Sequence, residues 1–488
     1  MRLRIDPVAR RRVAASAARI KAAVASAEWI YGVTTGFGSN AVHPIAAKDA
    51  AALQKNLLES HAFGAGERFP DEVVRLALLL RIHALARGYS GIRPATLDAL
   101  RRMYEADILA VVPCQGSVGA SGDLSPLSFL ALPLLGTGRV RVAGRETDAK
   151  RALRAAGIAP VTLAHKEGLA LVNGTQVTLA CALLALDGAI TALFAADVAA
   201  ALTTEALAGR SAALDARIHE ARGHVGQIDS AARMRKILAG SRLVDARVES
   251  IRGKRKAPQD AYGIRCAPQV HGAASDGFAY AEDVFATEID AATDNPLVFG
   301  DDVLSGGNFH GEPVALAADH LKLCAHELGS ISERRTATLV DPHMNEGLPA
   351  YLAPTPALHS GFMLPQYAAA AIVSENKVLC HPASADSIPT GANIEDHVSM
   401  GTTAARHAMR VVDNVHTVLA IELMAAAQAI ELRAETPSPR SARAVACIRT
   451  ALPHRKVDGP WGDALEKTRA LVASGAVVHA ALFSGEGR

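Results

Sequence analysis

The sequence predicts a mainly α-helical fold. Half of the 488 residues are hydrophobic, but only 4% are aromatic, and alanine recurs along the whole chain. Small aliphatic side chains with high helix propensity favour closely packed helices over sheet. A long apolar stripe from Glu395 to Arg433 predicts a helix buried at the centre of a bundle.

The most apolar stretch runs from Gly168 to Leu186. It contains Asn173 and Gln176 and is followed by Asp187, so it predicts a buried helix rather than a membrane span. The N-terminal segment is rich in arginine and lacks the apolar core of a signal peptide. We therefore expect a soluble, cytoplasmic protein.

Charge and cysteine content point away from several protein classes. The formal net charge is +2, with 51 basic and 49 acidic residues, so nothing indicates a nucleic-acid or membrane partner. The six cysteines show no Cys-x-x-Cys spacing and are expected to be reduced core thiols. No metal is expected, because His-Glu-x-x-His or comparable spacing is absent around His310, Glu312, His326 and His343.

Periodicity and turn residues place the remaining elements. Helices are expected over 13–31, 48–61, 70–88, 94–107 and 177–209. A short hairpin is expected over 138–146, and Lys254 to Lys256 are expected to lie in a solvated loop. We expect a single catalytic unit with three regions: an N-terminal region (1–165), a central helical bundle (166–434) and a C-terminal helical tail (435–488).

One short run can carry out chemistry on its own backbone. Between Gly116 and Pro126 lies Ala120-Ser121-Gly122. Because Gly122 has no Cβ, its backbone nitrogen can approach the carbonyl carbon of Ala120. Ring closure with loss of two waters, one from the Ser121 hydroxyl, would give an imidazolone with an exocyclic methylene, which is a strong electrophile.

The same run also fits the start of a helix. Ser125 would be the N-cap and Pro126 the first helical residue, with Leu124 and Phe129 as a hydrophobic staple. A serine-hydrolase elbow is excluded, because Asp123 stands where Gly-x-Ser-x-Gly requires glycine. The two remaining interpretations are compatible, since a helix N-terminus directed at the ring would make it more electrophilic.

Further motifs place polar or aromatic side chains beside glycines or at predicted helix ends. They are Tyr31 in Tyr-Gly-Val-Thr-Thr-Gly-Phe-Gly; His61 in Glu-Ser-His-Ala-Phe-Gly; Asn173 in Lys-Glu-Gly-Leu-Ala-Leu-Val-Asn-Gly-Thr-Gln; Gln259, Tyr262 and Arg265 in Gln-Asp-Ala-Tyr-Gly-Ile-Arg-Cys; Phe309 in Gly-Asn-Phe-His-Gly-Glu-Pro; Met363 in Gly-Phe-Met-Leu; and Glu395 in Ala-Asn-Ile-Glu-Asp-His. Ordinary structural roles are open to several of them. Asn173 with Gln176, and Asn393 with Asp396, fit helix N-caps.

Together these motifs resemble the aromatic amino acid ammonia-lyase family, whose members build the cofactor methylidene-imidazolone (MIO) from Ala-Ser-Gly. The resemblance extends from Tyr31 to about Arg433, with the motifs in family order. It implies a helical bundle of the fumarase/ammonia-lyase type and a homotetramer whose active sites combine residues of several subunits. It also implies MIO formed from Ala120, Ser121 and Gly122, an amino acid substrate, and no metal or nucleotide.

The resemblance assigns roles to single residues. It makes Tyr31, Tyr262 and Glu395 acid–base candidates and Ser121 the source of the electrophile. It places Arg265 on the substrate carboxylate, where a guanidinium can bind through two parallel hydrogen bonds. It puts Asn173 at the cofactor ring oxygen or the substrate, as an amide donor to a developing oxyanion. Substrate-binding positions are His61, Asn173, Gln259, Arg265, Phe309 and Met363.

The implied reaction is elimination of ammonia from L-histidine to give trans-urocanate. Histidine is favoured because His61 can hydrogen-bond an imidazole and Glu395 can act as base or pair with it. Addition of the substrate amine to the methylidene carbon and attack by the substrate's aromatic carbon both stay open.

Alternatives within and outside the family remain. Phe129, Gly391 and His271 depart from the commoner family residues, which leaves a phenylalanine or tyrosine ammonia-lyase or aminomutase as the alternative. Lyases of the fumarase type carry a Gly-Ser-Ser-x-Met-Pro loop. This chain lacks that motif, which argues against that class. A catalytically silent scaffold would keep Ser121 uncyclised.

Overall fold

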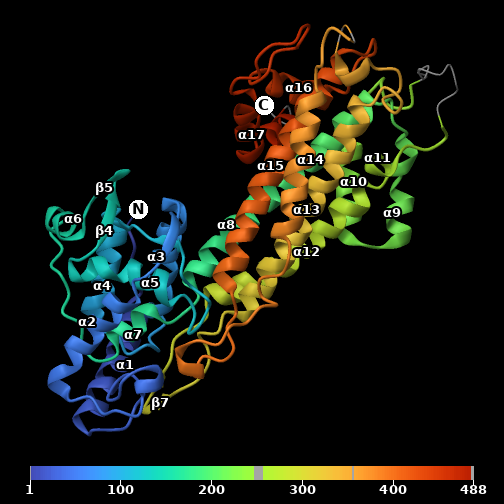
Figure 1. Cartoon of the computed structure of the whole chain (residues 1–488). Coiled ribbons are helices and arrows are strands. Elements are labelled where there is room, and N and C mark those ends of the chain that lie inside the picture. Colours follow the sequence, from blue (N-terminus) through green and yellow to red (C-terminus); the bar gives the residue numbers. More distant parts are fainter. Residues whose placement is uncertain (1, 247–256, 354, 356, 485–488) are drawn as a thin grey trace. The chain divides into compact units, whose positions relative to one another are not determined.

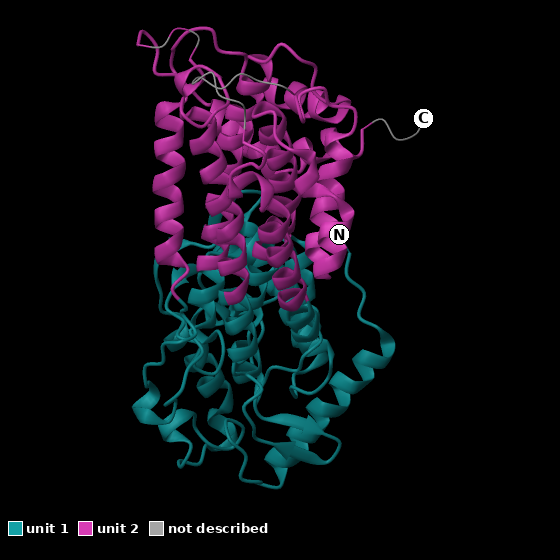
Figure 2. Ribbon diagram, turned by 90° about the vertical axis from the view of Figure 1, so that its right-hand side faces the viewer, with its two compact units in different colours: residues 1–184, 283–319, 382–406 teal, residues 185–282, 320–381, 407–488 magenta. Residues whose placement is uncertain are grey.

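The computed structural model describes residues 2–246, 257–353, 355 and 357–484; the loop expected at Lys254 to Lys256 lies outside them. Compactness divides the chain into two units, coloured separately in Figure 2. The first comprises 1–184, 283–319 and 382–406, and the second 185–282, 320–381 and 407–488. The three regions expected from the sequence stay a prediction.

The first unit combines short helices with small antiparallel sheets (Figure 1). Its helices are α1 (Pro7–Ala25), α2 (Ala50–His61), α3 (Asp71–Ala86), α4 (Pro94–Glu105), α5 (Leu124–Ala131), α6 (Ala149–Ala155) and α7 (Glu167–Val172), with 3-10 turns at Gly38–Asn40, Ala47–Asp49, Leu132–Leu135 and Gly391–Asn393. The sheets pair β1 (Ala65–Arg68) with β3 (Pro113–Gln115), β2 (Leu109–Ala110) with β4 (Arg139–Val142) and β5 (Arg145–Asp148), and β6 (Leu297–Phe299) with β7 (Asp302–Leu304). The β4–β5 pair confirms the predicted hairpin.

Long helices dominate the rest of the described chain. Four of them contain residues of both units: α8 (Gln176–Ala206), α12 (Ala267–Ile289), α13 (Glu312–Val340) and α15 (Gly401–Glu431). The second unit adds α9 (Ala216–Arg222), α10 (Val225–Leu238), α11 (Tyr262–Arg265), α14 (Met363–Leu379), α16 (Pro439–Arg449), α17 (Ala464–Ala473) and α18 (Ala476–Leu482), with 3-10 turns at Ser211–Leu214 and Ala350–Leu352. The helices of the second unit run alongside one another (Figure 2), which confirms the predicted mainly α-helical bundle.

Helix α8 is a core helix. Its length and composition would allow it to cross a membrane, but 61% of its most apolar window is buried inside the protein. Its buried carboxylate Asp197 accepts hydrogen bonds from Ser230 and Arg233. Polar groups that are satisfied by protein neighbours fit a protein interior, which is what the sequence predicts for this stretch.

Beside candidate site residues, three helices differ from their predicted bounds. α1 ends at Ala25 instead of Tyr31, and the chain reverses at Ala27, where φ is 55°. The stretch expected to be one helix from residue 168 to 186 is broken between α7 and α8. α15 begins at Gly401, not at Glu395, directly after Met400 with a φ of 52°. In each case a loop replaces helix next to a candidate site residue.

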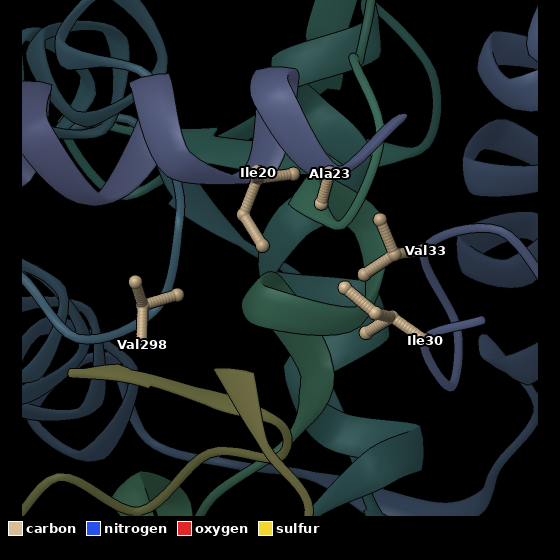
Figure 3. Close-up of a cluster of buried hydrophobic side chains, with 5 residues drawn as sticks. All are labelled: Ile20, Ala23, Ile30, Val33 and Val298. Carbon is tan, nitrogen blue, oxygen red and sulfur yellow. The ribbon is translucent and has the colours of Figure 1, made fainter. Parts of the chain in front are cut away.

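The loop that carries Tyr31 is anchored by buried apolar side chains. The cluster drawn in Figure 3 consists of Ile20 and Ala23 of α1, Ile30 and Val33 of the loop, and Val298 of β6. Gly32 lies at the centre of this loop with a φ of 65°, and a Cβ there would be 2.5 Å from Cδ2 of Leu169. Glycine is therefore required for the loop to approach α7 so closely.

None of the six cysteines, all of which lie in the described ranges, forms a disulfide bond. Cys181 is buried, and burial raises the pKa of its thiol far above the usual range. The other cysteines are half-buried, so most are less buried than the core thiols that the sequence predicts.

Candidate active site

A cavity of about 630 Å³ lies in the first unit. Its lining includes Tyr31, His61, Ser121, Asn173 and Glu395. These residues come from separate motifs of the chain, and folding brings them together around one space of the size typical of small-molecule sites. The rest of the lining comes mainly from the loop over 36–45, from helix α2, and from Leu124, Leu169 and Gly391.

The Ala120-Ser121-Gly122 segment is sharply folded. Ser121 has a φ of 52° and Gly122 a φ of 79°, and positive φ is uncommon for a residue other than glycine. A Cβ on Gly122 would be 2.2 Å from the carbonyl oxygen of Gly174, so only glycine fits there. A tight fold with glycine at the position of the attacking nitrogen is what cyclisation to MIO requires, and these residues therefore fit that group.

Hydrogen bonds hold this segment from one side. The backbone N–H of Asp123 donates to the oxygen of Gly174 at 2.7 Å, and the N–H of Gly174 donates to the oxygen of Ser121 at 3.4 Å. On the other side, the N–H of Met400 donates to the oxygen of Val118 at 3.0 Å. The segment is thus bonded to the backbone at Gly174 and at Met400, both in the same unit. These bonds fix the position of Ser121 at the cavity wall.

Asp123 fastens the segment to the N-terminus of α8. Its buried carboxylate accepts hydrogen bonds from the N–H groups of Val177 and Thr178 at 2.8 and 2.7 Å, and from the hydroxyls of Thr178 and Thr402 at 2.6 and 2.8 Å. Burial raises the pKa of Asp123, and these hydrogen bonds act in the opposite direction. A carboxylate at a helix N-terminus is also favoured by the helix dipole.

The helix start predicted with Ser125 as N-cap and Pro126 as first helical residue is wrong by two residues. α5 begins at Leu124, and Asp123 occupies the N-cap position without capping its own helix. The Ser125 hydroxyl donates to the oxygen of Phe63 at 2.6 Å instead. The physical reason is that the Asp123 side chain satisfies α8 rather than α5.

His61 closes α2 and offers the cavity a free nitrogen. The hydroxyl of Ser60 donates to the oxygen of Leu57 at 3.2 Å and lies 2.9 Å from Nδ1 of His61. The contact with Ser60 engages Nδ1, so Nε2 is the ring nitrogen of His61 left for the cavity. Burial lowers the pKa of His61, which favours the neutral imidazole.

Glu395 lies in a loop, not in a helix cap. Its Oε2 accepts a hydrogen bond from the hydroxyl of Thr390 at 2.8 Å, and the side chain is half-buried. The predicted N-cap formed by Asn393 and Asp396 is wrong, because α15 begins only at Gly401. The loop leaves the carboxylate free to line the cavity.

Asn173 presents its amide to both the protein and the cavity. The amide nitrogen donates to the oxygen of Asn295 at 3.0 Å and lies 3.5 Å from Oδ1 of Asp294. Asp294 in turn is paired with the buried Lys166 at 2.7 Å. Since the amide nitrogen is directed at these acceptors, the oxygen is the atom of Asn173 left for the cavity; the donor role predicted from the sequence stays a prediction.

Gln176 does not form the predicted capping pair with Asn173. Its side chain accepts from Arg81 at 2.6 Å and donates to Thr293 at 2.8 Å. These contacts fix the start of α8 behind the cavity wall.

Tyr31 lies at the edge of the cavity with a defined orientation. Its ring packs edge-on against Phe37, with centroids 6.5 Å apart and planes at 74°. The hydroxyl oxygen accepts the N–H of Gly38 at 3.1 Å. The phenolic hydrogen is left to be donated, which suits an acid–base group.

Gln259, Tyr262, Arg265 and Met363 belong to the second unit. Tyr262 is 71% exposed, and the guanidinium carbon of Arg265 stacks 4.4 Å from the centre of its ring. Nε of Arg265 is buried without a hydrogen-bond partner among the described residues. The guanidinium therefore has unused capacity for a carboxylate.

Phe309 does not line the cavity, although it belongs to the same unit. The next residue, His310, forms a cluster with Glu312 and His397 whose ligand-type atoms lie within 4.8 Å of one another. Nδ1 of His310 accepts the N–H of Glu312 at 3.3 Å, and its Nε2 lies 3.2 Å from Nδ1 of His397. This chain of hydrogen bonds already uses both nitrogens of His310, so we assign no metal there; the absence of a catalytic metal stays a prediction.

Sequence reasoning missed two hydroxyls that hold site residues. The hydroxyl of Thr390 orients the carboxylate of Glu395. The two residues are five positions apart in a loop, and this spacing matches no capping or turn motif that could have indicated the contact. Ser60 contacts His61, and their adjacency is a signal that could have indicated it. The sequence indicates for Asp123 only that a hydrolase elbow is excluded. In the structure its side chain fastens the Ser121 segment to α8.

Comparisons with known proteins identify the family of the chain. A profile described as aromatic amino acid lyase matches residues 1–450. A histidine ammonia-lyase of Geobacillus thermodenitrificans is 54% identical, over 86% of this chain and 82% of its own. The crystal structure of histidine ammonia-lyase from Trypanosoma cruzi matches with a TM-score of 0.89 and 41% identity, over 98% and 90% of the two chains. A tyrosine aminomutase from Streptomyces globisporus matches with a TM-score of 0.93 and 33% identity, over 99% and 94%.

Proposed function

The chain belongs to the aromatic amino acid lyase family, and we propose that it acts on L-histidine and releases ammonia and trans-urocanate. Family membership makes it a carbon–nitrogen lyase. The observation that carries the choice of histidine is that His61 and Glu395 line the same cavity as Ser121. An imidazole nitrogen and a carboxylate offer two polar contacts to a substrate imidazole, whereas a phenyl ring would leave both unpaired.

We propose MIO, formed from Ala120, Ser121 and Gly122, as the cofactor. The ring, when formed, supplies an electrophilic methylidene group that activates the substrate for loss of its amino group. The positive φ values of Ser121 and Gly122 and the close approach of Gly174 support this assignment.

The other site residues bind, orient and move protons. Arg265 would hold the substrate carboxylate through the hydrogen bonds that its guanidinium still has free. The oxygen of Asn173 would accept a hydrogen bond from the substrate ammonium group. Glu395, Tyr31 and Tyr262 are the candidates for removal of the β-proton. Tyr31, whose phenolic hydrogen is left to be donated, would act as an acid in that state and as a base only after losing this proton.

We also propose a cytoplasmic homotetramer with shared active sites and without nucleic-acid or membrane partners. The 71% exposure of the Tyr262 side chain supports sharing, because a second subunit would cover this predicted site residue. Mixing unfolded Ser121→Ala and Arg265→Ala subunits and refolding them together tests this. Recovery of activity from two inactive variants is expected if sites are shared, and no recovery would contradict it.

The substrate is tested by offering histidine, phenylalanine and tyrosine separately. Formation of urocanate, cinnamate or coumarate is followed by ultraviolet absorbance, and β-amino acid products are followed by chromatography. Urocanate as the dominant product is expected. Cinnamate, coumarate or a β-amino acid without urocanate would show that the chain is a phenylalanine or tyrosine enzyme, which is the alternative left open by Phe129.

A further inference from the structure

We propose that Thr390 is a positioning residue that holds the carboxylate of Glu395 in its working orientation. The inference rests on the proposed function, because it concerns how the cavity contacts the substrate side chain. Thr390 does not itself line the cavity, and it would act through Glu395.

Three hydrogen bonds clamp the two residues to each other. The Thr390 hydroxyl donates to Oε2 of Glu395 at 2.8 Å. The backbone N–H of Thr390 donates to the oxygen of Glu395 at 3.0 Å, and the N–H of Glu395 donates back to the oxygen of Thr390 at 3.4 Å. The backbone pair forms an isolated antiparallel bridge, so side chain and main chain of Glu395 are both fixed by one residue.

The turn between them is strained. Gly391, Ala392 and Asn393 have φ values of 57°, 57° and 66°, so three consecutive residues are left-handed. This conformation is disfavoured for a residue with a Cβ such as alanine, and asparagine tolerates it better. Strain of this kind persists where the surrounding structure requires one geometry, and it is concentrated at functional sites.

Gly391 leaves room for the carboxylate. A Cβ at this position would be 2.9 Å from Oε2 of Glu395, which is closer than real Cβ contacts. Because this oxygen is the end of a flexible side chain, a larger residue at 391 would displace the carboxylate from its present place. Glycine, which also adopts the φ of 57° readily, is compatible with a carboxylate held close to the turn.

The clamp determines which oxygen faces the substrate. Thr390 binds Oε2, and no donor among the described residues contacts Oε1 of Glu395. A glutamate side chain has several rotatable bonds, and an unclamped carboxylate would sample orientations in which neither oxygen points into the cavity. Holding one oxygen fixes the other beforehand, which lowers the entropic cost of reaching the reactive geometry.

The test compares Thr390→Val with Thr390→Ser in the full-length protein. Valine keeps the shape but removes the hydroxyl, whereas serine restores it. We expect Thr390→Val to lower kcat/KM for histidine by about tenfold, as for loss of a hydrogen bond to a charged group, and Thr390→Ser to recover most of the loss. Thr450→Val is the matched control, because that exposed hydroxyl bonds only to its own helix at Cys447.

A double-mutant cycle with Glu395→Gln separates positioning from a structural role. If Thr390 acts through the carboxylate, Thr390→Val costs much less in the Glu395→Gln background. Equal costs in both backgrounds, or a loss that serine fails to recover, would overturn the inference. MIO absorbance and the thermal midpoint of each variant show whether the cofactor and the fold are intact.

The two proposals fail in different ways. If the unmodified protein forms no urocanate, the proposed function fails whatever Thr390 does. If it forms urocanate and Thr390→Val keeps the full rate, only the positioning role fails.

Discussion

Polar groups are paired differently in the cavity of the first unit and in a buried ion network of the second unit. In the cavity some polar atoms lack a partner among the residues that the structure describes, whereas in the network they are paired. In the cavity, Nε2 of His61 and Oε1 of Glu395 have no partner within the described chain, although each side chain is oriented by a neighbouring hydroxyl. In the network, Asp197, His271, Arg335 and Glu422 are buried and bind one another or neighbouring groups.

The network is closed by short contacts. Arg335 donates to both oxygens of Glu422 at 2.6 and 2.8 Å, and the hydroxyl of Thr203 donates to Oε1 of the same carboxylate at 2.7 Å. Nδ1 of His271 lies 2.7 Å from Oδ1 of Asp197, and Nη1 of Arg335 lies 3.4 Å from Nε2 of His271. Such pairing satisfies buried charges, but it leaves no capacity to bind a ligand.

The difference indicates where function resides. A polar atom that is oriented but unpaired, next to a cavity, is available to a substrate, whereas a fully paired one contributes to the fold. The following substitutions test that division.

The largest effect is expected for Ser121→Ala. Without the serine hydroxyl the electrophile cannot form, so turnover should fall by more than about a thousandfold, since enzymatic acceleration of this size is ordinary. The near-ultraviolet absorbance of the ring should disappear while the thermal midpoint stays unchanged. Ser474→Ala, at an exposed helix end, is the control and should keep both activity and absorbance; near-normal turnover of Ser121→Ala would contradict the cofactor assignment.

Glu422→Ala should instead affect stability. It leaves the guanidinium of Arg335 buried without its carboxylate, at a cost of about 3–5 kcal/mol. Thermal unfolding at a fixed protein concentration should show a midpoint lowered by several degrees, whereas Glu220→Ala, at an exposed position, should not. A variant that loses turnover per folded molecule but keeps its thermal midpoint would assign the network to the active site.

The pH dependence of stability tests His271. Burial lowers its pKa, and the N–H of Arg335 facing Nε2 also disfavours a second proton. Asp197 and Glu422 act in the opposite direction. Below about pH 6.5 the unfolded chain binds a proton that the folded state excludes, so stability is present above that pH and falls on acidification by up to about 1.4 kcal/mol per pH unit.

Urea unfolding between pH 8 and pH 5 measures this slope. His271→Asn should flatten it, and His224→Asn, at an exposed position, should leave it unchanged. An unaltered slope in His271→Asn would show that other groups control the acid response.

The smallest effect is expected for Ser60→Ala. Removing the hydroxyl removes the hydrogen bond that orients the imidazole of His61, which should lower kcat/KM for histidine about two- to tenfold. Product absorbance measures the rate, and Ser474→Ala is the matched control at an exposed helix end. If Ser60→Ala left the rate for histidine unchanged, the orienting role of Ser60 would be wrong.

Much of the fold and part of the site could be predicted from the sequence. Alanine-rich apolar stripes determine helices locally, because propensity and periodicity act over a few turns. The chemistry of Ala120-Ser121-Gly122 also depends on residue type and on the freedom of Gly122, so the tripeptide itself indicates it. The helix ends beside the site were missed at Tyr31, Asn173 and Glu395, where side-chain and backbone contacts with distant segments outweigh local propensity.

The tertiary structure alone decided how the site residues are oriented. That Asn173 shows its oxygen to the cavity depends on Asn295, more than a hundred positions away along the chain. That Asp123 binds α8 rather than its own helix depends on Val177 and Thr178. The sequence by itself determined which groups are present and most of the helices around them, whereas hydrogen bonds between distant segments decided which of their atoms remain free, because a polar atom is available to a substrate only when no neighbour has already bound it.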